Sequence, residues 1–264
     1  MENNRSLDEK NNFFDNIICG KNSVAELLKS GREIDCLYVL KGREGSVGIA
    51  GKLIAESKNL GIPVKDVAKE KLDRMTDNAN HQGIAATVSA AEYKTVDDLF
   101  FIAEQKNEPP FFIICDEIED QHNLGAIIRT AEAAGVHGII IPKRRGASLT
   151  PVVAKVASGA LEYVAVARVS NLASTIDILK KRGVWIYGTD MKGQCYTKTD
   201  FGGALALVIG SEQNGIGRLI SEKCDFLVSL PMKGKINSLN ASAAAAVFVY
   251  EIMKCRGQLS GVKK

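Results

Sequence analysis

The sequence predicts an α/β protein whose C-terminal part holds a parallel sheet. Apolar, strand-like runs alternate with helical patterns along the chain, and in the second half these runs are almost continuously apolar. Runs of this second kind are typical of parallel strands that helices cover on both faces. With 264 residues, 45% of them hydrophobic and 25% charged, the chain has the size and composition of about two globular domains.

The chain divides into a tail, a small domain, a linker and a larger domain. The first segment is polar and charged, without the apolar stretch of a signal peptide, and we expect it to be disordered. The second alternates helix and strand, and the third is charged and ends in Pro109-Pro110. The fourth segment alternates strictly between strand and helix. The four segments are residues 1–14, 15–90, 91–110 and 111–258.

The elements of the small domain and the linker follow from hydrophobic periodicity and from glycines that end helices, such as Gly31 and Gly61. The predicted helices are residues 24–28, 48–59, 68–75 and, in the linker, 96–104. The predicted strands are residues 35–40, 62–64 and 83–88.

In the larger domain, Gly135 is expected to end a helix, and Pro151 to lie in the first turn of the next one. We expect Asn123 and Ser238 to cap the helices that follow them with their side-chain oxygens. The predicted strands are residues 111–116, 136–142, 163–169, 184–189, 205–210 and 226–230. The predicted helices are residues 124–134, 150–158, 172–181 and 241–253.

Rare side chains limit the possible chemistry. The six cysteines form no C-x-x-C pair, which favours neither a zinc site nor a disulfide framework and fits reduced thiols in the cytoplasm. Cys115 lies in an apolar run and Trp185 in a predicted strand, so we expect both in the core. His137 is expected to be structural, whereas His122 is a candidate supporting group near a site. No apolar run approaches the roughly 20 residues that span a membrane.

Three glycine-containing segments follow predicted strands: residues 188–193, 210–217 and 230–242. Glycine allows the backbone to approach a ligand closely, and ligands of parallel sheets bind beyond the carboxyl ends of the strands. Three ordinary turns are the alternative, which the occurrence at several strand ends disfavours. A dinucleotide-binding fingerprint is excluded, because Ile220 stands where its third glycine would be required.

A further candidate segment runs from Asn123 to Glu132, after a polar stretch that begins at Asp116. Arg129 and Glu132 are three residues apart and therefore neighbours on a helix surface. A cap with a surface ion pair is the simplest interpretation of this pattern. The polar stretch at the exit of a strand favours a site instead.

In combination these segments resemble the SpoU (TrmH-like) branch of the SPOUT methyltransferases, which transfer a methyl group from S-adenosyl-L-methionine to a ribose 2′-hydroxyl of RNA. The similar motifs are Asn123-Leu124-Gly125 with Arg129, Ile209-Gly210-Ser211-Glu212 with Gly215, and Leu230-Pro231-Met232 with Ser238-Leu239-Asn240 and Ser242. His81-Gln82-Gly83 and Pro142-Lys143-Arg144-Arg145 resemble segments of the branch that modifies a guanosine of 23S ribosomal RNA. Two positions depart from the usual pattern: Gln121, where many members have proline, and Ala241, where valine is usual.

The resemblance implies a deep trefoil knot in the larger domain and an RNA-binding fold like ribosomal protein L30e in the small one. It also implies a homodimer with each active site at the subunit interface. The residues expected to hold the cofactor are Gly188, Thr189, Gly210, Leu230, Met232, Ser238 and Leu239. Those expected around the reacting hydroxyl are Asn123, Arg129, Glu212, Ser238 and Asn240.

The family assigns activation of the hydroxyl to Arg129, but a guanidinium keeps its proton at neutral pH. Our interpretation is that Arg129 clamps a phosphate and stabilises developing alkoxide charge. Lys143, Arg144 and Arg145 are candidate RNA contacts, with a solvated basic loop as the alternative.

Three functions stay open at this point. They are a ribose 2′-O-methyltransferase acting on ribosomal RNA, one acting on transfer RNA, and a non-catalytic RNA-binding protein on the same scaffold. The distinct N-terminal domain favours the ribosomal substrate, and an oxidoreductase would need the glycine fingerprint that is missing.

Overall fold

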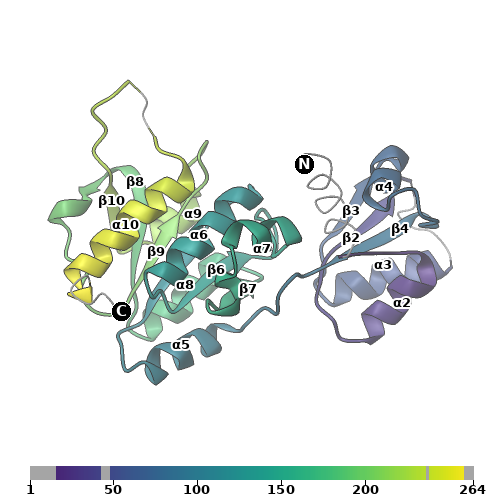
Figure 1. Ribbon diagram of the computed structural model, residues 1–264, viewed down its shortest axis with the longest axis horizontal. Helices are drawn as coiled ribbons and strands as arrows, with labels where there is room; N and C mark the ends of the chain where they lie inside the picture. The colour runs from purple at the N-terminus through teal and green to yellow at the C-terminus, as the bar shows by residue number, and fades with distance from the viewer. Residues whose placement is uncertain (1–15, 43–47, 236–237, 259–264) are drawn as a thin grey trace, which may run out of the picture. The chain divides into compact units, whose positions relative to one another are not determined.

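The computed structural model describes residues 16–42, 48–235 and 238–258, so the tail predicted for residues 1–14 lies outside the described residues. The chain forms two compact units (Figure 1). The first extends to Glu92 and includes Ser148–Val152, and the second comprises the remaining residues. Within the described part of the chain, none of the helices is long and apolar enough to cross a membrane.

The first unit contains a four-stranded sheet in the order β1-β4-β2-β3. β4 (Ile84–Val88) is antiparallel to β1 (Ile17–Cys19) and β2 (Ile34–Leu40), whereas β3 (Val64–Val67) is parallel to β2. The helices are α2 (Lys21–Lys29), α3 (Ile49–Asn59) and α4 (Lys69–Met75).

Two strands of this unit differ from the prediction. The strand expected at residues 62–64 begins only at Val64, because Pro63 has no N–H to donate to a ladder with β2. β1 is not predicted as a strand, since three residues are too short to reveal a periodicity. A buried apolar cluster of β2 and β4 with Val24 and Leu27 of α2 and Leu53 of α3 holds the unit together.

The second unit is built on a six-stranded sheet in which every neighbouring pair of strands is parallel. The strand order is β10-β8-β9-β5-β6-β7. The strands are β5 (Phe111–Cys115), β6 (Gly138–Pro142), β7 (Val166–Val169), β8 (Trp185–Cys195), β9 (Leu205–Ile209) and β10 (Phe226–Ser229). The parallel sheet predicted for this half of the chain is therefore confirmed.

Helices cover both faces of this sheet (Figure 1). α5 (Val96–Gln105), α8 (Leu172–Lys181) and α9 (Arg218–Lys223) contribute to a buried cluster that contains Phe112 and Ile114 of β5. Alternate residues of a strand point to opposite faces, so Phe111, Ile113 and Cys115 point the other way, and they too are buried. The remaining helices are α6 (Gln121–Ala133), α7 (Pro151–Ala157) and α10 (Ala241–Cys255), and α6 packs against α10.

Both predicted caps in this unit are wrong by two or three residues. α6 begins at Gln121, where Asp120 is the N-cap and accepts a hydrogen bond from the N–H of His122. Asn123 therefore lies inside the first turn. α10 is capped by Asn240, whose side-chain oxygen accepts from the N–H groups of Ser242 and Ala243, and Ser238 is not the cap. In both cases the side-chain oxygen nearer to the first helical residue provides the cap.

β8 is longer than predicted, and its pairing with β10 is interrupted by a bulge. β10 pairs first with Tyr187 and Gly188 of β8 and then, across a shift in register, with Gln194 and Cys195. Residues 189–193 are left out of this ladder, as in a β-bulge that re-aims side chains toward a site. Gly193 is required at the end of the bulge, because a Cβ there would overlap with the backbone of β10.

Trp185 is not a core residue, contrary to the prediction, because 52% of its side chain is exposed. It opens β8 beside the edge strand β10, where the ring of Phe226 lies 5.7 Å away between centroids. Cys115 is buried as expected, and burial raises the pKa of its thiol to about 12.

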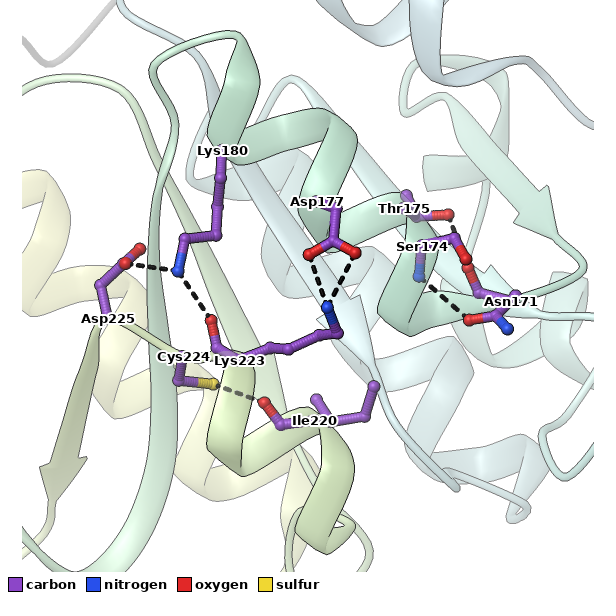
Figure 2. A network of polar contacts seen from close by, with 9 residues as sticks. All are labelled: Asn171, Ser174, Thr175, Asp177, Lys180, Ile220, Lys223, Cys224 and Asp225. Carbon is purple, nitrogen blue, oxygen red and sulfur yellow. Dashed lines mark hydrogen bonds and ion pairs between the residues drawn. The ribbon is translucent and has the colours of Figure 1, made fainter.

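Charged side chains fix the amino ends of β8 and β10 to the helices on one face (Figure 2). Nζ of Lys180 on α8 lies 2.6 Å from Oδ1 of Asp225, whose Oδ2 accepts a hydrogen bond from the N–H of Ile186 in β8. Lys223 of α9 lies 2.6 Å from Asp177 of α8. We refer to these four charged residues (Asp177, Lys180, Lys223 and Asp225) as the amino-end network.

Candidate active site

A cavity of about 420 Å³ lies at the carboxyl ends of β8, β9 and β10, and we call it the strand-end cavity. Three stretches of chain surround it. They are the bulge residues 189–192, the end of β9 with its loop (209–215), and the end of β10 with the segment after it, which contributes Val228, Ser229, Leu230, Met232, Ser238 and Leu239. Ala241, Ala244 and Phe248 of α10 complete the wall. The small residues at the start of α10 let this helix form a wall of the cavity.

The loop after β9 is tight because two glycines make it possible. Ser211 and Gly215 exchange two backbone hydrogen bonds of 2.9 and 3.0 Å, and Gly215 has a φ of 66°. A Cβ at Gly210 would overlap with the backbone of Gly215. The N–H of Gly217 donates 2.8 Å to Oδ2 of buried Asp116, which anchors the far end of the loop. Backbone groups therefore line the cavity at a fixed position.

Six of the seven predicted cofactor residues line the strand-end cavity. They are Thr189, Gly210, Leu230, Met232, Ser238 and Leu239. Gly188 does not line it but lies beneath, where a Cβ would collide with the sulfur of Cys224. The sequence pattern did not single out Asp190, Met191 or Phe248, because the bulge and the return of α10 that bring them to the wall depend on the tertiary fold.

Three of the five residues predicted around a reacting hydroxyl meet in one cluster, the Asn123–Glu212–Asn240 cluster. Oε1 of Glu212 accepts from Nδ2 of Asn123 at 3.0 Å, from Nδ2 of Asn240, and from the N–H of Ala241 at 3.3 Å. Nδ2 of Asn240 also donates to Oδ1 of Asn123 at 2.8 Å. Oδ1 of Asn240 caps α10, so its Nδ2 is the atom that faces Glu212 and Asn123. Oδ1 of Asn123 accepts from this Nδ2, and Nδ2 of Asn123 therefore donates to Glu212.

The cluster leaves one carboxylate oxygen available. Among the described residues, Oε2 of Glu212 accepts no hydrogen bond, whereas Oε1 accepts three. Asn123 is only 7% exposed, so it is a rigid support for Glu212. The arrangement holds a carboxylate at the cavity wall with one oxygen free to accept a proton or a hydrogen bond.

Arg129 and Ser238 are not part of the cluster. Arg129 follows Asn123 by six residues on α6, which corresponds to a rise of about 9 Å and a different side of the helix. Its side chain is exposed, and Nη1 lies 3.4 Å from Oγ of Ser158. Ser238 lines the strand-end cavity instead.

A second cavity of about 270 Å³ lies beside the first, at the carboxyl ends of β5 and β9, and we call it the acidic cavity. It shares the loop 211–214 and Ala241 with the strand-end cavity, and Asn123 and Glu212 are part of its wall. Its other carboxylates are those of Glu117, Glu119 and Asp120. The Asn123–Glu212–Asn240 cluster thus lies where two cavities meet.

The basic residues after β6 lie next to this acidic wall. Arg144 and Arg145 are exposed and Lys143 is half-buried. Nη1 of Arg145 lies 3.7 Å from Oε1 of Glu117. The guanidinium of Arg145 therefore borders the acidic cavity.

His122 and His137 lie in different surroundings. His122 is exposed in the first turn of α6. His137 is buried at the amino end of the sheet, where Nδ1 accepts from the N–H of Phe111 at 3.0 Å. Burial and the charge of Lys106 lower the pKa of His137 to about 4, so it is neutral at physiological pH. Its role is structural.

The fold and the two cavities define a parallel-sheet protein with a ligand site at the carboxyl ends of its strands. Comparison with known proteins gives the family. Residues 110–250 match the SpoU rRNA methylase family, and residues 17–94 match a family described as RNA 2′-O ribose methyltransferase substrate binding. The chain belongs to the SpoU family and is an enzyme of the RNA 2′-O-methyltransferase type, as the sequence motifs suggested.

Similar proteins cover almost the whole chain. YacO of Bacillus subtilis strain 168, assigned to the TrmH family of tRNA/rRNA methyltransferases, is 52% identical over 241 residues, which are 90% of this chain and 95% of YacO. A TrmH-family relative from Staphylococcus aureus strain MSSA476 is 42% identical over 243 residues, covering 92% of this chain and 97% of its own.

Solved structures share the fold. The SpoU methyltransferase AviRb from Streptomyces viridochromogenes, crystallised with the cofactor AdoMet, superposes with a TM-score of 0.57 and 24% identity over 93% of this chain and 91% of its own. An AdoMet-bound rRNA methyltransferase from Sinorhizobium meliloti gives a TM-score of 0.56 at 24% identity, over 90% and 86% of the two chains.

Proposed function

We propose that this protein transfers the methyl group of S-adenosyl-L-methionine to the ribose 2′-hydroxyl of a guanosine in 23S ribosomal RNA. The observation that carries the proposal is the position of Glu212 between two cavities that share a wall. One cavity would hold the methyl donor and the other the acceptor nucleoside. Methyl transfer needs the 2′-oxygen and the methyl carbon aligned at about 3–3.5 Å. Two cavities that share a wall favour this alignment.

The strand-end cavity fits the donor. Its volume lies in the range of small-molecule sites, about 300–1,000 Å³, and it combines apolar side chains with backbone groups of glycine loops. Leu230, Met232 and Leu239 offer apolar contact, and Thr189 and the backbone of Gly210 offer hydrogen bonds. Gly188 supports this wall through packing. When bound, S-adenosyl-L-methionine supplies an electrophilic methyl group on a sulfonium.

Glu212 is the group we assign to the hydroxyl of the acceptor. Its free Oε2 accepts the hydrogen of the ribose 2′-hydroxyl, while Asn123 and Asn240 hold Oε1 in place. Ser238 lines the donor cavity near the start of α10 and orients the reactants. A positioned carboxylate of this kind contributes to catalysis by accepting the proton as the oxygen attacks.

Arg129 reaches this site from the second subunit of a homodimer in our proposal. Within one chain, Arg129 lies on a different side of α6 from the Asn123–Glu212–Asn240 cluster. A guanidinium contributed by the partner would bind the phosphate of the acceptor and stabilise alkoxide charge. Mixing Arg129→Ala with Glu212→Gln tests this arrangement: a shared site restores activity in mixed dimers, whereas a site within one chain leaves them inactive.

RNA contacts extend beyond the site. The substrate-binding family match of residues 17–94 supports an RNA-binding role for the first unit, for which we propose an L30e-like fold. Lys143, Arg144 and Arg145 meet RNA phosphates beside the acidic cavity. Neutralising all three should reduce the salt dependence of RNA binding, and an unchanged salt slope would remove them from the interface.

A trefoil knot is part of the same proposal. Two observations support it. After the edge strand β10 the chain comes back as α10, which packs against α6. The N–H of Ala241 at the start of α10 also donates a hydrogen bond to Glu212 in the loop after β9. In this arrangement two strand-end loops wrap the donor cavity, and α10 closes it.

Mapping of 2′-O-methyl groups in RNA from a strain without the protein tests the substrate. Loss of one guanosine modification in 23S ribosomal RNA supports the proposal. Loss of a transfer RNA modification alone would assign the other substrate. Calorimetry with S-adenosyl-L-methionine tests the donor site: binding that is unchanged by substitutions in the strand-end cavity would contradict its assignment to the cofactor.

A further inference from the structure

We propose that the acidic cavity is a nucleobase pocket in which Glu119 reads the Watson–Crick edge of the target guanine. The inference rests on the proposed function, since it needs an acceptor nucleoside beside Glu212. It goes further by assigning the reading of the base to one side chain.

The position of the cavity carries the first step. The acidic cavity and the strand-end cavity meet at Glu212, Ala241 and the loop 211–214. A ribose whose 2′-hydroxyl contacts Glu212 opposite the methyl donor must place its base to one side. The acidic cavity is a hollow on that side, at the ends of the adjacent strands β5 and β9.

The charge of the cavity selects the part of the nucleotide that enters. Three carboxylates besides Glu212 line it, and they repel a phosphate. Arg145 borders it on the outside, with Nη1 3.7 Å from Oε1 of Glu117. A negative hollow with a positive border matches a nucleotide whose base enters and whose phosphate stays outside.

Glu119 is the carboxylate that is available in this cavity. Asp120 is used as the cap of α6, and Glu117 faces Arg145. Among the described residues, Glu119 has no hydrogen-bond or ion-pair partner. Between Glu117 and Glu119, Ile118 is 4% exposed and its carbonyl accepts from the N–H of Ala147 at 2.7 Å, so the loop is anchored.

Two adjacent N–H donors distinguish guanine from the other bases. N1–H and the 2-amino group of guanine match the two oxygens of one carboxylate. Adenine and cytosine present one amino group beside a ring acceptor, and uracil presents one N–H between two carbonyls. Lone pairs facing a carboxylate repel it, so Glu119 favours guanine.

The test starts from methyl transfer to total RNA of a strain that lacks the protein, followed by mapping of the modified nucleotide. A short RNA with this nucleotide is then made with guanosine or with inosine, which lacks the 2-amino group. We expect the wild type to prefer guanosine by about tenfold or more in kcat/KM. Glu119→Gln should lower kcat/KM on guanosine by a similar factor and no longer distinguish the two RNAs.

Several results would overturn this inference. Modification of adenosine, cytidine or uridine would do so while the methyltransferase function stands. The same holds if Glu119→Gln keeps the guanosine preference or lowers both rates equally. Methyl transfer to no RNA at all would overturn the proposed function, and this inference with it. Glu104→Gln, an exposed carboxylate on α5, is the matched control and should behave as wild type, and both variants should bind S-adenosyl-L-methionine as tightly as the wild type.

Discussion

At the carboxyl ends of β9 and β10, the polar groups of the Asn123–Glu212–Asn240 cluster converge on one oxygen of Glu212 and leave the other oxygen free. At the amino ends of β8 and β10, the amino-end network uses both oxygens of Asp225. One pairs with Lys180 (Figure 2), and the other accepts from the N–H of Ile186. The carboxylate at the carboxyl ends lies between two cavities, whereas that at the amino ends joins helices to strands.

Within one sheet, the carboxylate at the carboxyl ends is placed for a reaction, and the carboxylate at the amino ends holds helices and strands together. Strong charge pairing alone does not mark a site, because a carboxylate held through both of its oxygens is fixed as a link between helix and strand. A carboxylate fixed by amides through one oxygen keeps that capacity. The position at the carboxyl ends of parallel strands agrees with the general location of ligand sites in such sheets.

Replacing Glu212 by glutamine should produce the largest effect. The amide oxygen of glutamine still accepts from Asn123 and Asn240, but the free acceptor becomes a donor. We expect kcat for methyl transfer to fall by about 100-fold or more, since positioned acid–base groups contribute about 10²–10⁴. Retention of a third of the wild-type rate would remove Glu212 from the reaction, and binding of S-adenosyl-L-methionine by calorimetry checks that the cavity is intact.

Arg129→Lys should have the next largest effect. Lysine keeps the charge but loses the planar fork that binds phosphate through two donors. We expect a loss of about 10- to 100-fold in kcat/KM for RNA. Thermal stability should stay unchanged because the side chain is exposed. A lysine variant with nearly full turnover would exclude a role that depends on the guanidinium.

The sequence was sufficient to predict the parallel sheet and to name six residues that line the strand-end cavity. Apolar runs such as residues 111–115 and 205–209 identify buried parallel strands, and motif resemblance identified Glu212 and Asn240. The bulge of residues 189–193 and the exposure of Trp185 could not be predicted, because both depend on the edge strand β10 that pairs with β8. The separation of Arg129 from Asn123, by contrast, follows from their spacing of six residues along one helix and could have been read from the sequence.

The amino end of the sheet should show its structural role through the pH dependence of stability. The pKa of His137 is lowered from 6.5 to about 4 in the folded protein, so the unfolded chain binds a proton first as the pH falls. Stability from this group is complete above about pH 6.5 and is lost as the pH falls toward 4. From pH 7 to pH 5 we expect a loss of about 2 kcal/mol in the free energy of unfolding.

Urea unfolding of wild type and His137→Gln at the two pH values isolates this contribution from that of the carboxylates. The variant should lose less stability than the wild type over the same interval. An equal loss in both proteins would mean that His137 does not titrate differently on unfolding.

Lys180→Met should give the smallest effect and the sharpest contrast with Glu212→Gln. The apolar part of the methionine side chain keeps the packing of α8, but Asp225 loses its ion pair and keeps one hydrogen bond from Ile186. Because Lys180 is 38% exposed, water compensates part of the loss, and we expect about 1 kcal/mol less stability toward urea. Methyl transfer at 25 °C should be unchanged, since the free oxygen of Glu212 and both cavities lie at the opposite end of the strands. A large fall in kcat without a fall in stability would show that the amino-end network acts on the reaction, and the two ends of the sheet would then no longer be separable into site and support.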